Sequence, residues 1–559
     1  MAAPRFWMTA IGCATLWLGA CGGGAEPGSQ GGASPLASSG QVAATTASKV
    51  SYHAAARFAE QASFGATPAL IQELRAKGFE RWIDEQFALP LRPIDTAPVE
   101  RYTTRIPSDE ERNYLRTQFG TRALVAPDQL RQRVLWSLSQ WVVAGINKGE
   151  PAGHLHWVNL LERDAFGNYR TLLREATRNP HMGHFLDNDQ NRPKSSECPH
   201  CAPNENYARE LMQLFTIGVF KLNADGTPVR DARGRLIEAY TQRDVEELAR
   251  ALTGWMHDPN PPNRPQQNWG NWARPMVAST WPPDRDSGAK SVLGRPFPAG
   301  QSADRDLDDA IDLLMNHPNI GPFVALRLIQ HLVKSDPSPA YIGRVAARFR
   351  DNGSGVAGDM KATIKAVLLD PEARAGDDPA RSTASDGKMR EPVLHGTASF
   401  RGLGCKSLPR WSDGNPWQSW TQQFFNPPNV FSFYAPTDRA PGSNLLAPEQ
   451  KLLASNEFTS RLGLLTSITW NGVQRRRDLS PLTNAGCDIQ TFVQAYERGA
   501  KPFIDLVSER YFRGAMPHTL RSNIEQQMRK PTWNTSAEGE GALQMIGMAL
   551  STPYFGVIK

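Results

Sequence analysis

Cysteine is scarce in this chain, with 6 among 559 residues, and long apolar runs are absent beyond the N-terminus. No later segment reaches the roughly 18 apolar residues that a membrane-spanning helix needs, which excludes an integral membrane body. Lysine and arginine, 62 together, outnumber the 56 acidic residues by only six, and neither sign forms long blocks. A nucleic-acid-binding protein would cluster its basic residues, so we expect no nucleic-acid partner. No internal period is sharp enough to predict a repeat array.

The N-terminus, residues 1–21, has the features of a targeting segment. Arg5 supplies a positive start, and residues 6–20 are apolar but too short to span a bilayer. The segment ends in Leu-Gly-Ala-Cys21, which resembles a bacterial lipoprotein cleavage box. This resemblance implies cleavage before Cys21 and attachment of lipid to its thiol, and Gly22 implies sorting to the outer membrane. The alternative is a plain secretory signal in which Cys21 is incidental.

Residues 22–50 are mostly glycine, alanine, serine and threonine, with almost no charge. Such a composition cannot bury enough apolar surface to fold, so the segment is predicted to be a flexible tether. Residues 51–559 have the mixture of apolar and charged side chains that is ordinary for a globular body. The sequence therefore predicts a lipid anchor, a tether and a folded body in the bacterial cell envelope.

The most distinctive stretch of this body is 181–255. A helix is predicted from Glu205, because Asn204 can cap it and because apolar residues then recur on one side. Gly218 is expected to end this helix. The apolar side comprises Tyr207, Ala208, Leu211, Met212, Leu214 and Phe215.

Acidic residues in and before this helix are candidates for acid–base catalysis. Glu205 and Glu210, with Arg209 between them, form such a pair only if a second layer of structure buries them and shifts their pKa values. Asp187 and Asp189 in the preceding polar segment are further candidates. The alternative is a solvated face, on which Glu205 and Arg209 form an i,i+4 ion pair worth about 0.3–0.5 kcal/mol.

A short β-hairpin is predicted within residues 219–240, around the turn dipeptide Asp225-Gly226. The next helix is expected to begin after Thr241, which has Asp244 at the position required for a capping box. The apolar residues of this second helix recur at i, i+3, i+4 and i+7, which predicts one buried face. Two amphipathic helices thus flank one hairpin insertion.

Apolar residues recur with helical spacing in most of the remaining chain, so the predicted fold class is mainly α. An early helix is expected to open at Thr67-Pro68 and to end at Gly78. Four amphipathic segments within residues 302–374, separated by His-Pro, Asp-Pro and glycine-rich breaks, favour a compact sub-bundle. The predicted architecture is a multi-helix globular body with a hairpin insertion and long loops rich in proline and tryptophan.

Two groups of tryptophans lie in these loops, one within residues 256–300 and one just before Asn426. Indole rings in loops can stack on sugar faces, which makes both groups candidates for contact with a polysaccharide. The alternative is that they pin irregular loops onto the core. His257 is predicted to anchor its loop, because no partner stands beside it at metal-ligand spacing. The candidate tryptophans are Trp269, Trp272, Trp281, Trp411, Trp417 and Trp420.

Four cysteines remain after the two in the leader, namely Cys198, Cys201, Cys405 and Cys487. An even number in an exported protein favours disulfides, and proximity favours Cys198–Cys201 and Cys405–Cys487. The sequence leaves the other two pairings open. A redox-active Cys-Pro-His-Cys motif is a third interpretation, although the thioredoxin-like βαβ context is missing.

A structural zinc ion is the competing interpretation of the first cysteine pair. His181 and His184, followed after thirteen residues by Cys198 and Cys201, form a ligand set that zinc accepts in tetrahedral geometry. An oxidising compartment disfavours the free thiolates that this site requires. Four protein ligands would also leave no open position for water, so the metal would be structural and not catalytic. We therefore expect no cofactor.

A family resemblance rests on four motifs: NENYARELMQLFTIGV, YTQRDVEELARALTGW, RFAEQASFGATPALIQELRAKGFERWIDEQFALP and the terminal ALSTPYFGVIK. They resemble the bacterial family catalogued as domain of unknown function 1800, over residues 54–559. The resemblance implies an exported, mostly helical protein, encoded near sulfatase-like proteins that are candidate partners. It implies no reaction and no catalytic residues. The histidines and cysteines of the candidate zinc set are not part of the family pattern.

Two functions compete on this sequence. The first is binding or assembly of an extracellular polymer or an envelope partner. The second is cleavage of a polysaccharide, by a hydrolase or a lyase reaction, that uses the carboxylates between Asp187 and Glu210. Carboxyl groups about 5–10 Å apart in a tryptophan-lined cleft would favour a glycosidase. Carboxyl groups that point into bulk solvent would favour binding.

Overall fold

The computed structural model describes residues 50–100, 108–146, 148–259, 271–383, 385–410, 420–471, 476–529 and 539–559. Within these ranges the chain is mainly α-helical, and its strands form only small two-stranded sheets, as the sequence predicts. The predicted lipidation site Cys21, the tether up to residue 49 and the candidates Trp269, Trp411 and Trp417 lie outside the described residues. No described helix is both long enough and apolar enough to cross a membrane.

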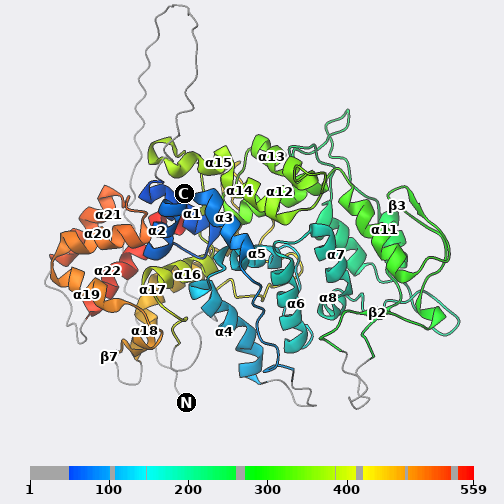
Figure 1. The fold of residues 1–559 in the computed structure, drawn as a ribbon, viewed down its shortest axis with the longest axis horizontal. Helices are drawn as coiled ribbons and strands as arrows, with labels where there is room; N and C mark the ends of the chain where they lie inside the picture. The colour runs from blue at the N-terminus through cyan, green and yellow to red at the C-terminus, as the bar shows by residue number, and fades with distance from the viewer. Residues whose placement is uncertain are drawn as a thin grey trace, which may run out of the picture. The chain divides into compact units, whose positions relative to one another are not determined.

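The first part of the body consists of helices (Figure 1), and the helix after Thr67 has the ends that local capping rules predict. The side chain of Thr67 accepts a hydrogen bond from the Leu70 backbone N–H, Pro68 occupies the first helical position, and Gly78 ends the helix with φ of 79°. Both predicted boundaries are confirmed. The helices are α1 (Tyr52–Ala62), α2 (Pro68–Lys77), α3 (Phe79–Ala88), α4 (Asp109–Val125), α5 (Gln129–Ser139), α6 (Pro151–Asp164), α7 (Tyr169–Arg178) and α8 (Pro180–Phe185).

The predicted helix after Asn204 forms, but only its first part is α-helical. The Oδ1 of Asn204 accepts a hydrogen bond at 2.9 Å from the backbone N–H of Asn206, the first residue of α9 (Asn206–Glu210). The chain continues as the π-helix η1 (Leu211–Thr216) before Gly218, with φ of 69°, ends it. The backbone N–H of Ile217 donates to the carbonyl of Met212, five residues earlier, at 2.8 Å. An uninterrupted α-helix is therefore the wrong prediction for this segment.

The hairpin insertion consists of isolated antiparallel bridges and not of extended strands. Bridges join Phe220 to Glu238 and Arg230 to Leu236, and a turn at Asp225-Gly226 reverses the chain as predicted. Helix α10 (Gln242–Ala251) follows, with the predicted capping box between Thr241 and Asp244.

The segment predicted as a long loop after α10 contains two small sheets. Strand β1 (Trp255–Met256) pairs with β2 (Val277–Ala278), and β3 (Lys290–Val292) pairs with β4 (Arg295–Phe297). A 3₁₀ turn, η2 (Pro282–Asp284), lies between them. These pairings hold both ends of the segment on the body.

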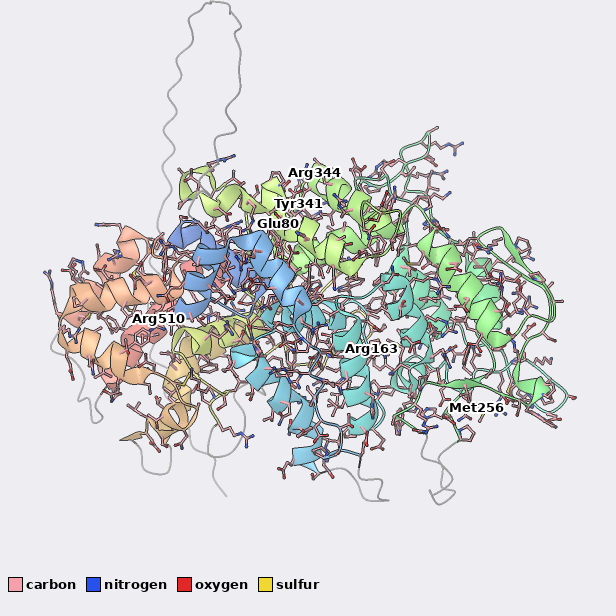
Figure 2. The ribbon with its side chains drawn as sticks, in the orientation of Figure 1. Glu80, Arg163, Met256, Tyr341, Arg344 and Arg510 are labelled. Atoms are coloured by element: carbon pink, nitrogen blue, oxygen red, sulfur yellow. A yellow bond between two sulfur atoms is a disulfide. The ribbon has the colours of Figure 1, made fainter. Side chains whose placement is uncertain are left out.

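Four helices follow in the region of the predicted sub-bundle: α11 (Ala303–Met315), α12 (Ile320–Leu332), α13 (Pro339–Arg350) and α14 (Met360–Leu369). Helices α12, α13 and α14 pack against one another, whereas α11 packs on α7 and α10. Two labelled residues of α13 show how it is held (Figure 2): the Tyr341 hydroxyl donates to the Val367 carbonyl at 2.5 Å, and Arg344 pairs with Asp370 at 2.7 Å.

The remaining elements close the body on its own N-terminal part. Strand β8 pairs with β5 and contacts α1, so the two ends of the described body lie together (Figure 1). One connected cluster of buried apolar side chains extends through these elements. They are α15 (Pro371–Arg374), η3 (Ala375–Asp377), η4 (Pro379–Arg381), β5 (Lys388–Met389), α16 (Pro392–Gly402), η6 (Pro448–Leu452), α17 (Ser455–Ile468), β6 (Trp470–Asn471), β7 (Arg476–Arg477), α18 (Ser480–Asn484), α19 (Ile489–Glu497), α20 (Ala500–Tyr511), α21 (His518–Met528), α22 (Glu540–Leu550), α23 (Pro553–Gly556) and β8 (Val557–Ile558).

Candidate functional site

Glu205 and Glu210, the two glutamates predicted as an acid–base pair, lie in different environments. The Glu205 side chain is 36% exposed, pairs with Arg209 at 2.7 Å and accepts a hydrogen bond from Gln242 at 2.8 Å. Glu210 is buried, and its Oε2 has no hydrogen-bond partner among the described residues. Burial raises the pKa of Glu210 to about 7, although the nearby Arg209 opposes this shift. Glu210 thus has the properties of a general acid, whereas Glu205 is a solvated surface carboxylate.

The two candidate aspartates are already engaged by basic or amide groups. Asp187 is exposed and accepts hydrogen bonds from Lys148 Nζ at 2.5 Å and Asn206 Nδ2 at 3.2 Å. Asp189 pairs with His257 Nε2 at 3.3 Å, which gives His257 the loop-anchoring contact that its sequence context predicts. Of the four candidate carboxylates, Glu210 alone therefore lacks a hydrogen-bonding or ionic partner in the part of the chain that the structure describes.

Trp272 lies at the centre of a histidine–tryptophan cluster, which comprises His181, His184, His257 and Trp272. The three imidazole rings lie 4.8–6.3 Å from its indole ring, centroid to centroid. The indole rests on Gly153, where an added Cβ would lie 2.5 Å from its Cε3 atom. Trp272 is only 7% exposed, so it pins its loop onto α6 and is not available for stacking on a polymer.

The candidate zinc set is not assembled in the structure. Cys198 and Cys201 form a disulfide, as do Cys405 and Cys487, so the first pair offers no thiolate for a metal. His181 is fully buried, and its Nε2 lies 3.2 Å from the carbonyl of Gly145. Across the described residues, no group of three or more His, Cys, Asp and Glu side chains is placed to hold a metal ion. Both predicted disulfide pairings are confirmed.

Of the candidate tryptophans that the structure describes, one is exposed. Trp420 is 6% exposed and packs where a Cβ on Gly396 would lie 2.2 Å from its ring. Trp281 is 54% exposed, and its indole N–H donates to Glu197 at 3.1 Å. Trp420, like Trp272, is therefore a core residue, whereas Trp281 presents its ring to solvent.

A second polar site lies beside α12 and was not predicted from the sequence. A narrow cleft, which we call the α12 cleft, has a volume of about 40 Å³. It is lined by Gln140, Trp141, Val143, Leu214, Arg327, Gln330, His331, Val430, Phe431, Tyr434 and Pro436. The polar residues of α12 in this lining stand at i, i+3 and i+4, so one face of an otherwise apolar helix points into the cleft.

Charged side chains form a buried ionic cluster adjoining this lining. Lys388 Nζ lies 2.7 Å from Glu391 Oε1 and 3.5 Å from Glu449 Oε1, and all three side chains are at most 1% exposed. The same Nζ donates to the carbonyl of His331 at 3.1 Å, and Arg133 donates to that carbonyl as well. The cluster is therefore linked directly to the α12 residue that lines the cleft.

The pKa values in the cluster follow from burial and from its cations. Burial opposes ionisation of Glu391, but Lys388 and the neighbouring cations outweigh it and lower its pKa to about 2. Burial raises the pKa of Glu449, and the nearby charge of Glu391 adds to this effect. Burial lowers the pKa of His331 to about 3, so its imidazole is neutral at pH 7. Arg133 and Lys388 thus face one fully ionised carboxylate.

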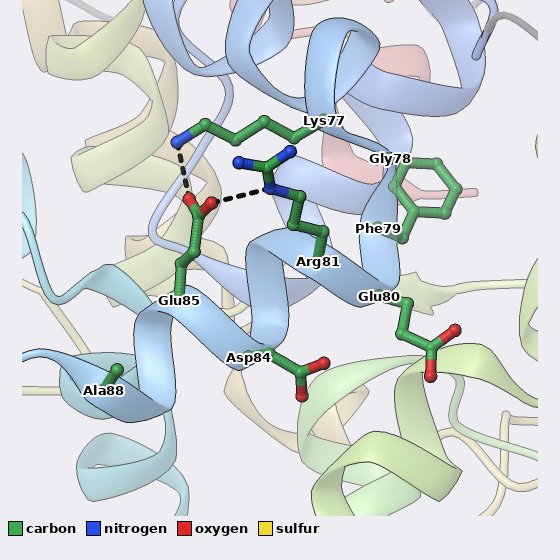
Figure 3. A pocket seen from close by; sticks show the side chains of 8 residues that line it. All are labelled: Lys77, Gly78, Phe79, Glu80, Arg81, Asp84, Glu85 and Ala88. Carbon is green, nitrogen blue, oxygen red and sulfur yellow. Dashed lines mark hydrogen bonds and ion pairs between the residues drawn. The ribbon is translucent and has the colours of Figure 1, made fainter. Parts of the chain in front are cut away.

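A broad surface depression on α2 and α3 is also charged, but its side chains are paired and exposed (Figure 3). Glu85 accepts from Lys77 at 2.6 Å and from Arg81 at 3.0 Å, as the dashed lines show. Glu80 and Asp84 both pair with Lys365 of α14. Solvated pairs of this kind are ordinary surface features, so this depression is not a candidate site.

Comparisons with known proteins identify the family of the chain. Neither the curated proteins nor the solved structures include a match. One family model matches nearly the whole body, in agreement with the resemblance seen in the four sequence motifs. The chain belongs to the family described as protein of unknown function (DUF1800), whose model matches residues 57–557.

Proposed function

We propose that this chain is an exported lipoprotein, anchored through Cys21 to the outer membrane of a bacterial envelope, whose body binds an extracellular polysaccharide. The leader sequence supports the anchor, and the disulfides Cys198–Cys201 and Cys405–Cys487 support an oxidising compartment. Metabolic labelling with an alkyne fatty acid tests the anchor. Label should enter the wild-type chain and be lost in Cys21→Ser, and equal labelling of both would contradict the proposal.

The observation that carries polymer binding is the fixed, exposed ring of Trp281. Its indole N–H is held by Glu197, and its backbone N–H donates to Ser279 Oγ at 3.1 Å. Glu197 directly precedes Cys198, whose disulfide to Cys201 constrains that loop. A ring held in this way offers an apolar face to the C–H groups of a sugar, and little side-chain entropy is lost on binding. The neighbouring carboxylate of Glu197 can accept hydrogen bonds from the hydroxyl groups of the sugar.

Affinity electrophoresis of the purified chain against neutral and acidic polysaccharides tests this function. Trp281→Ala should weaken binding about tenfold or more, because an aromatic anchor of an interface is typically worth 2 kcal/mol or above. Its melting temperature should stay unchanged, since the ring is exposed. Tyr554→Ala, which removes another half-exposed aromatic ring, is the matched control and should bind normally. Binding that survives Trp281→Ala would contradict the proposal.

A sulfatase-like protein of the same envelope is the partner that the family resemblance supports. Cross-linking in intact cells followed by purification of the chain tests this part of the proposal. Recovery of a sulfatase-like protein with the wild-type chain is expected. Its absence from the cross-linked material would contradict the partnership but would leave polymer binding untouched.

Cleavage of a polysaccharide by a hydrolase or a lyase reaction is the second candidate function. The burial of Glu210 is the observation that favours it. A buried carboxyl group with a pKa of about 7 is suited to donate a proton at neutral pH. Release of reducing ends or unsaturated products from a polysaccharide panel is the assay. Glu210→Gln should abolish turnover while Glu205→Gln retains it, and turnover by Glu210→Gln would exclude this role.

A further inference from the structure

Two residues that line the α12 cleft carry hydrogen-bond donors without an acceptor among the described residues. Arg327 is partly exposed, its guanidinium makes no hydrogen bond and no ion pair with any described residue, and its Cζ atom lies 4.6 Å from the centre of the Phe323 ring. The Nε1–H of Trp141, a residue that is 4% exposed, is likewise without a partner in the described part of the chain. Buried donors without a partner, such as this indole N–H, are rare in folded proteins, and each one calls for a physical explanation.

No carboxylate in the described part of the chain forms an ion pair with Arg327. Glu391, whose charge acts on His331 of the cleft lining, is already bound by Lys388 at 2.7 Å and by Gln422 at 2.6 Å. Burial lowers the pKa of Arg327 to about 10, which leaves the guanidinium charged at neutral pH. A partly buried cation without a counter-ion is unfavourable, and an anion that enters the cleft would relieve this cost.

The size of the cleft limits what can enter it. A volume of about 40 Å³ holds a few water molecules or one small ionic group, since a single water needs about 10–15 Å³ on the same measure. A whole sugar ring or a peptide would not fit. The aromatic residues Phe431 and Tyr434 form part of its wall.

We propose that the α12 cleft binds a small oxyanion, a carboxylate or sulfate group, with the Arg327 guanidinium and the Trp141 indole N–H as its donors. The planar guanidinium can donate two parallel hydrogen bonds to two oxygens of such a group. The neutral His331 and the amide of Gln140 complete a polar lining that has no competing free carboxylate. The inference does not depend on the polymer-binding role of Trp281.

Titration of the full-length chain labelled with ¹⁵N at the tryptophan indoles tests the proposal. The chain has 15 tryptophans, and Trp141→Phe identifies the signal of Trp141. Sodium acetate and sodium sulfate are the probes, at constant ionic strength set with sodium chloride, and acetamide is the neutral analogue of acetate. The Trp141 signal should shift saturably with acetate, sulfate or both, and it should not respond to acetamide or chloride.

Variants of Arg327 separate binding from folding. Arg327→Gln should weaken the anion response at least tenfold, and Arg327→Lys should weaken it several-fold, because an ammonium group cannot form the bidentate pair. Arg243→Gln, which removes an exposed arginine of α10 without an ion pair, should bind like the wild type. An unmoved Trp141 signal, an equal response to acetamide, or full binding by a folded Arg327→Gln or Arg327→Lys would overturn the proposal.

Discussion

Replacement of Lys388 by methionine should destabilise the protein more than any surface substitution of a charged residue. Lys388 is fully buried and lies 2.7 Å from Glu391, so Lys388→Met leaves a buried carboxylate without its main counter-ion. Removal of one partner from a buried pair typically costs about 3–5 kcal/mol. The pKa of Glu391 gives the same magnitude: lowering it from 4.5 to about 2 corresponds to roughly 3 kcal/mol, at about 1.4 kcal/mol per pKa unit.

Urea unfolding followed by circular dichroism measures this loss. Because the pKa of Glu391 is lowered in the folded state, its contribution is present above pH 4.5 and disappears as the pH falls towards 2. The difference between wild type and Lys388→Met should therefore be largest at neutral pH and should shrink below pH 4.5.

Two further variants make the test specific. The double variant Lys388→Met/Glu391→Gln should recover more than half of the lost stability, because it removes the unpaired charge and keeps an amide for Gln422. Lys501→Met breaks an exposed pair with Asp505 and should change little. A Lys388→Met protein within about 1 kcal/mol of the wild type at pH 7 would refute the role assigned to this ion pair.

Two other perturbations follow from the same reasoning. The pKa of Glu210 is raised from 4.5 to about 7, so the wild type loses stability as the pH rises from 4.5 through 7, and Glu210→Gln should melt at a higher temperature than the wild type at pH 8 but not at pH 5. An equal difference at both values would show that burial does not shift this carboxyl group. The Cys405–Cys487 disulfide spans 82 residues, and its removal by paired serines should cost about 4–5 kcal/mol on the loop-entropy account. Paired serines at Cys198–Cys201, a separation of 3, should cost about 1.5–2 kcal/mol, and calorimetry that reversed this order would contradict the account.

Local chemistry made much of the fold predictable. The Thr67 cap, the stop at Gly78 and the capping box of Thr241 with Asp244 depend only on residues within one helical turn. The turn at Asp225-Gly226 and the Cys198–Cys201 disulfide likewise follow from short-range patterns. Apolar periodicity was sufficient for the mainly α class, because a one-sided apolar stripe has to be buried against another element.

Distant contacts explain where the predicted local structure is wrong. The carbonyl of Phe215 accepts a hydrogen bond at 2.6 Å from the hydroxyl of Tyr169, which is 46 residues away, within the segment that becomes a π-helix. Strand β1 pairs with β2 through two residues on each side, too few for a strand pattern in the sequence. Neither arrangement has a local signal, so tertiary context decides both.

The candidate sites could be predicted only in part from the sequence, because tertiary context also decides which polar side chains are buried. A carboxyl group in this helix needs burial to act as an acid or base, but which of Glu205 and Glu210 is buried depends on packing against other elements. The α12 cleft gave one weak signal, the polar residues Arg327, Gln330 and His331 in an apolar helix. Its other walls come from segments more than 90 residues away, which no helical pattern can assign.

The ionic cluster explains why these distant walls meet where they do. Pairing of β5 with β8 places Lys388 opposite Ile558, and Glu449 comes from η6. Gln330 of α12 donates to the carbonyl of Pro436 at 2.9 Å, which ties the helix to the opposite wall of the cleft. Buried ion pairs seldom stabilise a fold more than apolar residues of the same size would, so stability alone does not account for the cluster. Its directional bonds instead fix the relative positions of α12, β5 and η6, and hence the orientation of the helix face that carries Arg327.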